Sequence, residues 1–254
     1  MKKLERQGSQ WIVLDTTNPP FNNVKVRQAL SLATNAKQIN EVVLKDAYFN
    51  AVSLVAPGVP GQKAANALSY DAAKAKTLLA DAGFPDGKGW PAGVKFTYSS
   101  TSAENKAIGE AVQAMWKQAL NIDIVLEPME AKAFDDWRTS RKDQPFHMYV
   151  GGWGSDYEDP NNWYNLLFHS KADFYYTHWK NADFDKLVDD GLKEIDAAKR
   201  KATYEQADKI LNDSAPFITV YHWGRFVVTK PNVSLTRYRV LGRVQGYLVR
   251  ITPQ

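Results

Sequence analysis

Residues 94–128 restrict the fold more than any other part of the sequence. Apolar residues alternate with other residues over 94–98 and again over 122–126, which is typical of half-buried strands. Between these segments, apolar residues recur at helical spacing over 102–119. A strand, a helix and a second strand within this length predict a βαβ unit with parallel strands and a right-handed crossover. The chain therefore needs a sheet that is at least partly parallel and that a helix covers.

Further strands and helices follow from the same kinds of pattern. Strands are predicted at residues 11–16, 146–150, 217–221, 226–229 and 247–251. Helices are predicted within residues 24–44 and at 72–82, 131–140, 184–195 and 199–212, with Asn35 and Asp71 as N-caps. Residues 50–69 are rich in Gly, Pro, Ala and Asn and predict an ordered but irregular crossing. Together these elements predict an α/β fold, in which a mixed, partly parallel sheet is flanked by helices.

Composition excludes several classes of protein. With 254 residues, of which 44% are hydrophobic, the chain can bury a sizeable core. The net charge of +4 is spread over interleaved acidic and basic residues, so no nucleic-acid partner is expected. The absence of cysteine excludes disulfides, cysteine-based metal sites and thiol nucleophiles. No apolar run approaches the about 20 residues of a membrane span, and we expect no signal peptide within this chain.

Sequence motifs for catalysis, cofactors and metals are lacking. Residues 83–89 (GFPDGKG) resemble a phosphate-binding loop, but the spacing is short and no Ser or Thr follows the lysine, so a tight turn is the better interpretation. The four histidines are scattered, without the spacing of metal ligands. No pairing of a nucleophile with a base is visible. We therefore expect a protein that is not an enzyme and that holds neither a cofactor nor a metal.

Residues 146–168 carry the features of a ligand site. An apolar strand runs into Gly151 and Gly152, which we expect to turn the chain sharply and to let a ligand approach the backbone. Beyond them, Trp153 and Tyr157 offer flat apolar faces, and Asp156 and Asp159 offer anionic acceptors. Ligand sites of α/β sheets lie beyond the carboxyl ends of strands, which is where this segment is predicted to fall.

A resemblance to a known family rests on the same segment. Residues 152–160 (GWGSDYEDP) resemble the Gly-Trp-x-x-Asp-Tyr-x-Asp-Pro signature of the oligopeptide- and dipeptide-binding proteins of ABC importers, the extracytoplasmic solute-binding proteins of family 5. Residues 20–30, 70–84 and 181–187 resemble three further motifs of this family, in the same order. Four motifs in register across most of the chain argue against coincidence.

The resemblance implies a single lobe of a periplasmic-binding-protein type II fold. Proteins of this family are about twice as long and have two lobes joined by a hinge, and the matches begin where the second lobe begins. We therefore expect residues 1–254 to form one C-terminal ligand-binding lobe, with the N-terminal lobe absent. Residues 1–20 and 230–254 are expected to be its hinge-side segments.

The resemblance also suggests roles for individual residues. In peptide-binding members, the aspartate at the position of Asp156 pairs with the ammonium group of the peptide's N-terminus. The alternative is that Asp156 caps the helix that follows or braces the turn. Trp153 either lines a side-chain pocket or fills the core, and Arg141 either points toward the ligand or lies in solvent at the end of a helix. With Gly152 and Tyr157, these residues form the expected ligand site.

The function that follows is capture of a solute, preferably a peptide, for delivery to an ABC permease. The resemblance implies a location in the periplasm or on the extracellular side of a membrane, and a hinge that closes two lobes over the solute. Two alternatives stay open: the same fold with a non-peptide solute such as an oligosaccharide or a metal chelate, and an engineered, isolated lobe with no binding activity of its own. A cleft surface around Trp153 and Tyr157 that lacks its opposite lobe also predicts self-association.

Overall fold

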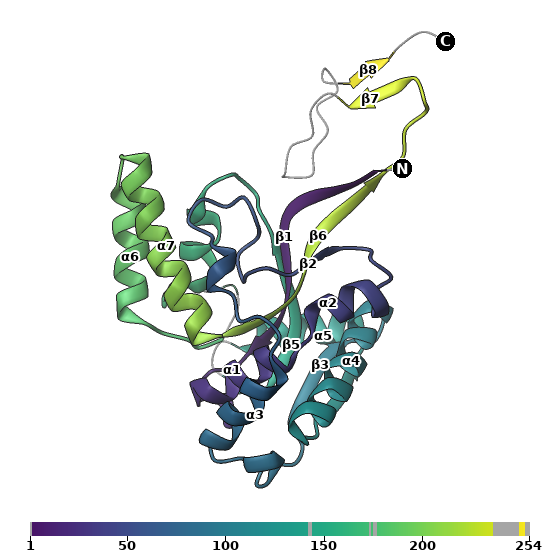
Figure 1. Cartoon of the computed structure of the whole chain (residues 1–254), viewed down its shortest axis with the longest axis vertical. Coiled ribbons are helices and arrows are strands. Elements are labelled where there is room, and N and C mark those ends of the chain that lie inside the picture. Colours follow the sequence, from purple (N-terminus) through teal and green to yellow (C-terminus); the bar gives the residue numbers. More distant parts are fainter. Residues whose placement is uncertain (1, 142–143, 173, 175–176, 236–248, 252–254) are drawn as a thin grey trace.

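A computed structural model describes residues 2–141, 144–172, 174, 177–235 and 249–251. The main sheet has six strands in the order β2-β6-β1-β5-β3-β4, and β7 and β8 form a separate pair (Figure 1). The strands are β1 (Lys2–Leu14), β2 (Phe49–Asn50), β3 (Lys95–Ser99), β4 (Val125–Met129), β5 (Met148–Gly154), β6 (Phe217–Val227), β7 (Val233–Leu235) and β8 (Val249–Ile251). Strands β4, β3 and β5 are parallel, whereas β1 pairs antiparallel with both β5 and β6. The mixed, partly parallel sheet that the sequence predicts is confirmed.

The helices begin and end close to the predicted positions. They are α1 (Val24–Ala33), α2 (Ala36–Gln38), α3 (Ala72–Asp81), α4 (Ala103–Leu120), α5 (Ala131–Thr139), α6 (Ala182–Lys193) and α7 (Ala197–Ser214). The predicted caps are confirmed, because the side chains of Asn35 and Asp71 accept hydrogen bonds from the backbone N–H groups of Gln38 and Lys74. Short π-helical turns at Ile39–Val43 and Tyr164–Phe168 and short 3₁₀ turns at Ala64–Asn66, Pro85–Gly87 and Pro160–Asn162 complete the helical structure.

The predicted βαβ unit is formed by β3, α4 and β4. The register of the two strands runs from Lys95 opposite Val125 to Ser99 opposite Met129, in parallel. Ser102 caps α4, and Asn121 ends it in the left-handed conformation with a φ of 54°. The phosphate-loop look-alike at residues 83–89 forms the predicted tight turn, with Gly83, Gly87 and Gly89 at positive φ.

Two hydrophobic clusters fill the two faces of the sheet. Because side chains alternate along a strand, Ile12 and Leu14 of β1 join one cluster while Trp11 and Val13 join the other. Helices α1, α3 and α4 cover the first face. Helices α6 and α7, together with residues 54–59 and 163–168, cover the second face. Figure 1 shows α6 and α7 on the left, apart from α1, α3 and α4 below and to the right.

Several strands differ from the sequence prediction. Strand β1 begins well before residue 11, and one strand, β6, spans most of the two segments predicted at 217–221 and 226–229. β1 and β6 form a long ribbon that leaves the body of the molecule together (Figure 1). Of the predicted strand 247–251, residues 247 and 248 lie outside the described residues. In the described part of the chain, no helix is both long enough and apolar enough to cross a membrane.

Candidate functional site

Strand β5 leads directly into the segment that the sequence singles out. The strand continues through Gly154, so Gly151 and Gly152 lie in extended backbone. The chain leaves the sheet only after Gly154 and reaches a 3₁₀ turn at Pro160–Asn162. The prediction of a sharp turn at the first glycine pair is therefore wrong, because the pairing of β5 with β1 persists through them.

The glycines of β5 make room for side chains of neighbouring strands. A Cβ on Gly152 would lie 2.4 Å from Oε1 of Gln10, and a Cβ on Gly154 would lie 2.6 Å from the ring of Trp223. A Cβ on Gly8 of β1 would meet the same ring at 2.5 Å. Glycine at these positions lets the indole of Trp223 lie flat against the sheet. The space beside Gly152 holds the side chain of Gln10.

Asp156 lies at the start of the loop after β5, and its side chain is exposed. Its backbone N–H donates to Oδ1 of Asn162 at 3.0 Å, and the amide of Asn162 reaches its carboxylate only at 3.4 Å. Asn162 is fully buried and also accepts from Nε1 of Trp153 at 3.2 Å, so this amide holds the loop against the strand. The backbone of Asp156 is thereby held in place, and its carboxylate remains exposed.

Asp159, three residues further, is the residue that caps the 3₁₀ turn. Its carboxylate accepts from the backbone N–H of Asn161 at 2.8 Å, so the alternative in which Asp156 is the cap is wrong. Arg200 of α7 binds the same carboxylate through two hydrogen bonds of 2.8 and 2.9 Å. Burial opposes ionisation of Asp159, but the bonds from Arg200 and Asn161 outweigh it and hold its pKa below the ordinary value.

A cavity of about 480 Å³ lies beside the end of β5. Its lining combines aromatic rings with two guanidinium groups and the glycine-rich strand: Arg6, Gln10, Arg138, Val150, Gly151, Gly152, Trp153, Gly154, Phe174 and Trp223. Trp153 and Phe174 meet edge to face, with ring centroids 4.7 Å apart. Cavities of this size and mixed lining are typical of small-molecule sites. Of the residues predicted from sequence, Trp153 and Gly152 line this cavity.

The remaining predicted residues lie elsewhere. Arg141 folds back on the end of α5, where its Nε donates to the carbonyl of Trp137 at 2.9 Å and its guanidinium lies over the ring of Trp137. The structure thus favours the helix-end interpretation of Arg141. Tyr157 is 45% exposed and donates a hydrogen bond to Asn161. Neither residue lines the cavity.

A second cavity, of about 440 Å³, adjoins the first and shares Arg6 and Trp223 with it. His222 forms part of its wall and is only 2% exposed. Its Nε2 accepts from the backbone N–H of Val52 at 3.0 Å, and its Nδ1 lies 2.9 Å from Oγ of Ser9. Burial lowers the pKa of His222 to about 4, so the ring is neutral at physiological pH.

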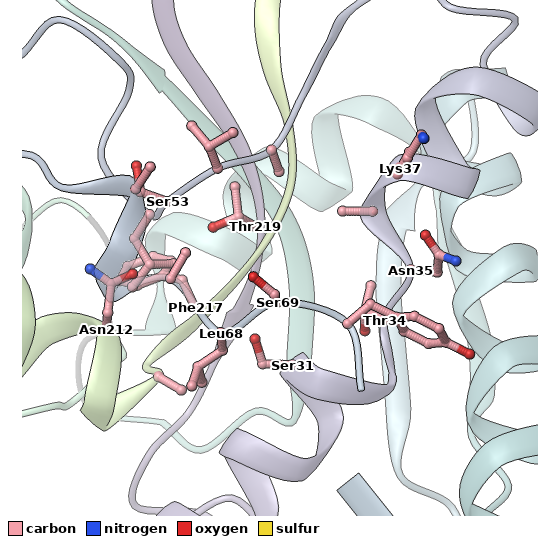
Figure 2. Close-up of a pocket in the computed structure, with 18 residues that line it drawn as sticks. Ser31, Thr34, Asn35, Lys37, Ser53, Leu68, Ser69, Asn212, Phe217 and Thr219 are labelled. Carbon is pink, nitrogen blue, oxygen red and sulfur yellow. The ribbon is translucent and has the colours of Figure 1, made fainter. Parts of the chain in front are cut away.

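A third cavity, of about 310 Å³, lies at the edge of β6 and away from the predicted residues (Figure 2). Hydroxyl and amide side chains such as Ser31, Asn35, Ser69 and Thr219 line it, together with Lys37. None of the ligand-site residues predicted from sequence lines it. In the part of the chain that the structure describes, no group of three or more His, Asp or Glu side chains is placed to hold a metal ion.

Several lining side chains were not predicted from sequence, among them Arg6, Gln10, Arg138, Phe174 and Trp223. Arg6 and Trp223 meet because β1 and β6 pair over residues more than 200 positions apart, with Glu5 opposite Gly224 and Ser9 opposite His222. Nothing local marks such a pair. The sequence does contain a weak indication of Trp223. Gly8 and Gly154 lie in strands whose other residues mostly carry side chains, and a glycine within a strand can indicate that a large side chain packs against the backbone there.

Comparisons with known proteins agree with this architecture. Residues 2–175 match the model of the bacterial extracellular solute-binding proteins, family 5 (middle part). The chain is 30% identical to the probable deoxycholate-binding periplasmic protein YgiS of Escherichia coli, over 92% of this chain and 43% of that protein. It is 31% identical to the periplasmic oligopeptide-binding protein OppA of Salmonella typhimurium, over 86% of this chain and 40% of that protein.

A solved structure shows the same likeness in three dimensions. The periplasmic binding protein DppA of Helicobacter pylori in complex with the peptide STSA superposes with a TM-score of 0.78 at 25% identity, over 98% of this chain and 48% of that one. The chain therefore spans less than half the length of each of these three proteins.

Proposed function

Because the chain belongs to the bacterial extracellular solute-binding proteins of family 5, we propose that it is the ligand-capturing lobe of an ABC-importer binding protein and that its solute is a peptide. The observation that carries the choice of a peptide is the exposed carboxylate of Asp156, which lies two residues beyond the cavity-lining Gly154. A fixed carboxylate next to a cavity suits a ligand that bears an ammonium group.

The surroundings of Asp156 support a role in binding the N-terminus of a peptide. In the described residues, the side chain of Asp156 has one hydrogen bond, a long one of 3.4 Å from Asn162. The carboxylate of Asp159, three residues further along the chain, is already hydrogen-bonded to Arg200. Asp156 can therefore form a charge-assisted hydrogen bond with an incoming ammonium without breaking an internal ion pair. The names of the Salmonella and Helicobacter relatives, an oligopeptide-binding protein and a peptide complex, agree with this choice.

A non-peptide solute is the second candidate. The YgiS relative is named for deoxycholate, and a further relative, from Haemophilus influenzae and 29% identical, is named a heme-binding protein. The aromatic lining by Trp153, Phe174 and Trp223 would suit the flat apolar body of such a solute. Asp156 discriminates between the two, because its negative charge favours an amine over a solute that carries only carboxylates.

We further propose that the chain works with a second lobe, as one wall of a cleft that closes over the solute. Residues 1–20 and 230–254 are the proposed hinge-side segments, and the first of them contributes β1 to the ribbon of β1 and β6. Most of the second segment lies outside the described residues. The permease of an ABC importer is the proposed partner and the periplasm or the extracellular side of a membrane the proposed location. The exposed rings of Tyr157 and Phe174, at 45% and 43%, support self-association of the chain when it is alone.

The test is titration of the isotope-labelled chain with trialanine, followed through the NMR signals of the tryptophan indole N–H groups. We expect millimolar binding, since half of a two-lobed cleft is used, and a shift of the Trp153 signal. Asp156→Asn, or acetylation of the peptide, should weaken binding at least about tenfold, because either change removes one charge of the pair. Asp183→Asn, in the first turn of α6, is the matched control and should bind as the unchanged chain does. Equal affinity for free and acetylated trialanine would exclude Asp156 as the ammonium site.

A further inference from the structure

Two arginines line the cavity beside β5, and no acidic residue among the described residues lines it with them. Arg6 comes from β1 and Arg138 from α5. No Asp or Glu is among the described residues that line the cavity. A cavity whose described lining carries two positive charges and no negative one attracts anions.

Arg6 is held in place by stacking. Its guanidinium lies over the ring of Trp223, 4.8 Å from the centroid, and in the described residues it has neither a hydrogen bond nor an ion pair. Trp223 itself is fixed, because it lies against Gly8 and Gly154 and its Nε1 points to Oε1 of Gln10 at 3.3 Å. One face of the Arg6 guanidinium is therefore covered by the ring of Trp223, while the N–H donors at its edge can bind a ligand.

Arg138 has only a weak internal partner. Its Nη2 lies 3.7 Å from the carboxylate of Asp135, one turn earlier on α5, and the side chain of Asp135 is 69% exposed. Ion pairs of this kind, long and exposed on one helix, contribute little. The guanidinium of Arg138 can turn toward the cavity at small cost.

Two other buried or half-buried arginines in the described part of the chain, Arg27 and Arg200, have acceptors for their donors. Arg200 has two bonds to Asp159, and Arg27 donates to the carbonyls of Ser214 and Phe21. Buried and half-buried arginines are normally saturated with acceptors, because each carries five N–H donors and a permanent charge. The donors of Arg6 and Arg138 that face the cavity are left for a ligand.

We propose that this cavity is a carboxylate-binding subsite and that the chain selects peptides with a carboxylate placed to enter it. The carboxylate comes either from an acidic side chain or from the C-terminus of a short peptide. A guanidinium matches the two oxygens of a carboxylate with two parallel hydrogen bonds. The rings of Trp153 and Trp223 hold the apolar stem that carries the group. The proposal rests on the proposed function, since it names the preference of the same site.

The experiment uses three peptides that all keep a free N-terminal ammonium: Ala-Glu-Ala amide, Ala-Gln-Ala amide and Ala-Gln-Ala with a free C-terminus. Affinities for the 254-residue chain come from the indole N–H signals of Trp153 and Trp223 at low salt. We expect at least one of the two carboxylate-bearing peptides to bind about tenfold more tightly than Ala-Gln-Ala amide. The one that does identifies the source of the carboxylate, a side chain or the C-terminus.

Variants assign the preference to the two arginines. Arg138→Gln, on α5, and Arg6→Gln should each reduce severalfold the ratio of the affinity for the preferred carboxylate-bearing peptide to that for Ala-Gln-Ala amide. Arg141→Gln, which removes an arginine that folds back on its own helix, should keep the full preference. Equal affinity for all three peptides would overturn the subsite and leave the proposed function standing. No binding of any peptide would overturn the proposed function, and the subsite with it.

Discussion

The face of the sheet that α1, α3 and α4 cover and the face that α6 and α7 cover are packed in different ways. The first cluster is mostly aliphatic, and its helical part comes from regular α-helices, as Leu30, Leu79 and Val112 illustrate. The second is rich in large rings, among them Trp11 and Trp163, whose centroids lie 5.9 Å apart. Much of the second cluster comes from irregular backbone at residues 54–59 and 163–168. The regular face serves as a scaffold, whereas the aromatic face lies under the loop that positions Asp156.

The aromatic face also contains a buried charge. Asp208 of α7 is fully buried and accepts hydrogen bonds from the hydroxyl of Tyr164, the side chain of Asn66 and the backbone N–H of Lys63. Burial raises its pKa, and these donors counteract that rise. The irregular segment around Asn66 is thus tied to α7 by polar bonds, in addition to apolar contact. Irregular backbone in the interior needs such partners, because its polar groups have no ladder to join.

The largest expected effect compares neighbouring residues that point to opposite faces. Trp11→Ala should lower the free energy of unfolding by about 3–5 kcal/mol, and Ile12→Ala by roughly 2–5 kcal/mol, because both side chains are fully buried. Only Trp11→Ala removes the donor to the carbonyl of Leu54, so only this variant should make residues 54–59 sensitive to proteases. Urea unfolding and limited proteolysis measure the two effects. Equal proteolysis of both variants would contradict the proposed difference between the faces.

Acid should loosen the junction between β6 and the segment that follows β2. The pKa of His222 is about 4 in the folded chain, below its ordinary value of 6.5, so between these values the unfolded chain binds a proton that the folded chain does not. The free energy of unfolding should therefore fall as pH decreases from 6.5 toward 4, by up to roughly 3 kcal/mol for this group. His147, whose pKa burial also lowers, adds to the same trend.

The variant His222→Gln isolates this contribution. It should show a shallower loss of stability between pH 6.5 and 5 in urea unfolding, because only the part from His147 and other groups remains. A pH dependence as steep as that of the unchanged chain would show that His222 does not set it.

The smallest expected effect concerns ion pairs. Asp159→Asn should cost about 1 kcal/mol, because the pair with Arg200 is bidentate but partly exposed. Asp190→Asn, which breaks the exposed pair with Lys186 on α6, is the matched control and should cost less than about 0.5 kcal/mol. Thermal unfolding measures both. A larger loss of stability in Asp190→Asn than in Asp159→Asn would show that the ion pair of Asp159 with Arg200 does not stabilise the aromatic face more than an exposed helix pair does.

The regular face was predictable from sequence because its determinants are local. Ser102 as a cap, the helical spacing of α4 and the alternation in β3 and β4 each depend on residues within a few positions of one another. The aromatic face was not predictable to the same degree. Trp11 shows why, since its neighbours Trp163 and Phe217 come from distant segments and its hydrogen bond goes to an irregular loop.

The site was found from sequence only in part, for the same reason. The motif at residues 152–160 gave Trp153 and Asp156, which are close in sequence to the end of β5. Arg6 and Trp223 depend on the pairing of the first and the sixth strand, which no local pattern encodes. The turn predicted at Gly151 and Gly152 is wrong, because a glycine in sequence fits a turn, a ligand contact or a close side chain equally well, and only the structure reveals Gln10 beside Gly152.

The long ribbon of β1 and β6 brings the two ends of the main body of the protein side by side. Lys2 lies opposite Val227 at one end of the ribbon, and Val13 lies opposite Phe217 at the other. Residues 2 and 227 lie side by side, and the chain between them contains the whole six-stranded sheet and its helices. A genetic exchange between relatives at these two positions would therefore move the sheet and its helices together. In such a chimaera, the exchanged segment would be joined at one place only, where β1 and β6 pair in antiparallel fashion. Recombination at these two positions would move the body of the protein, with its cavities, as one unit.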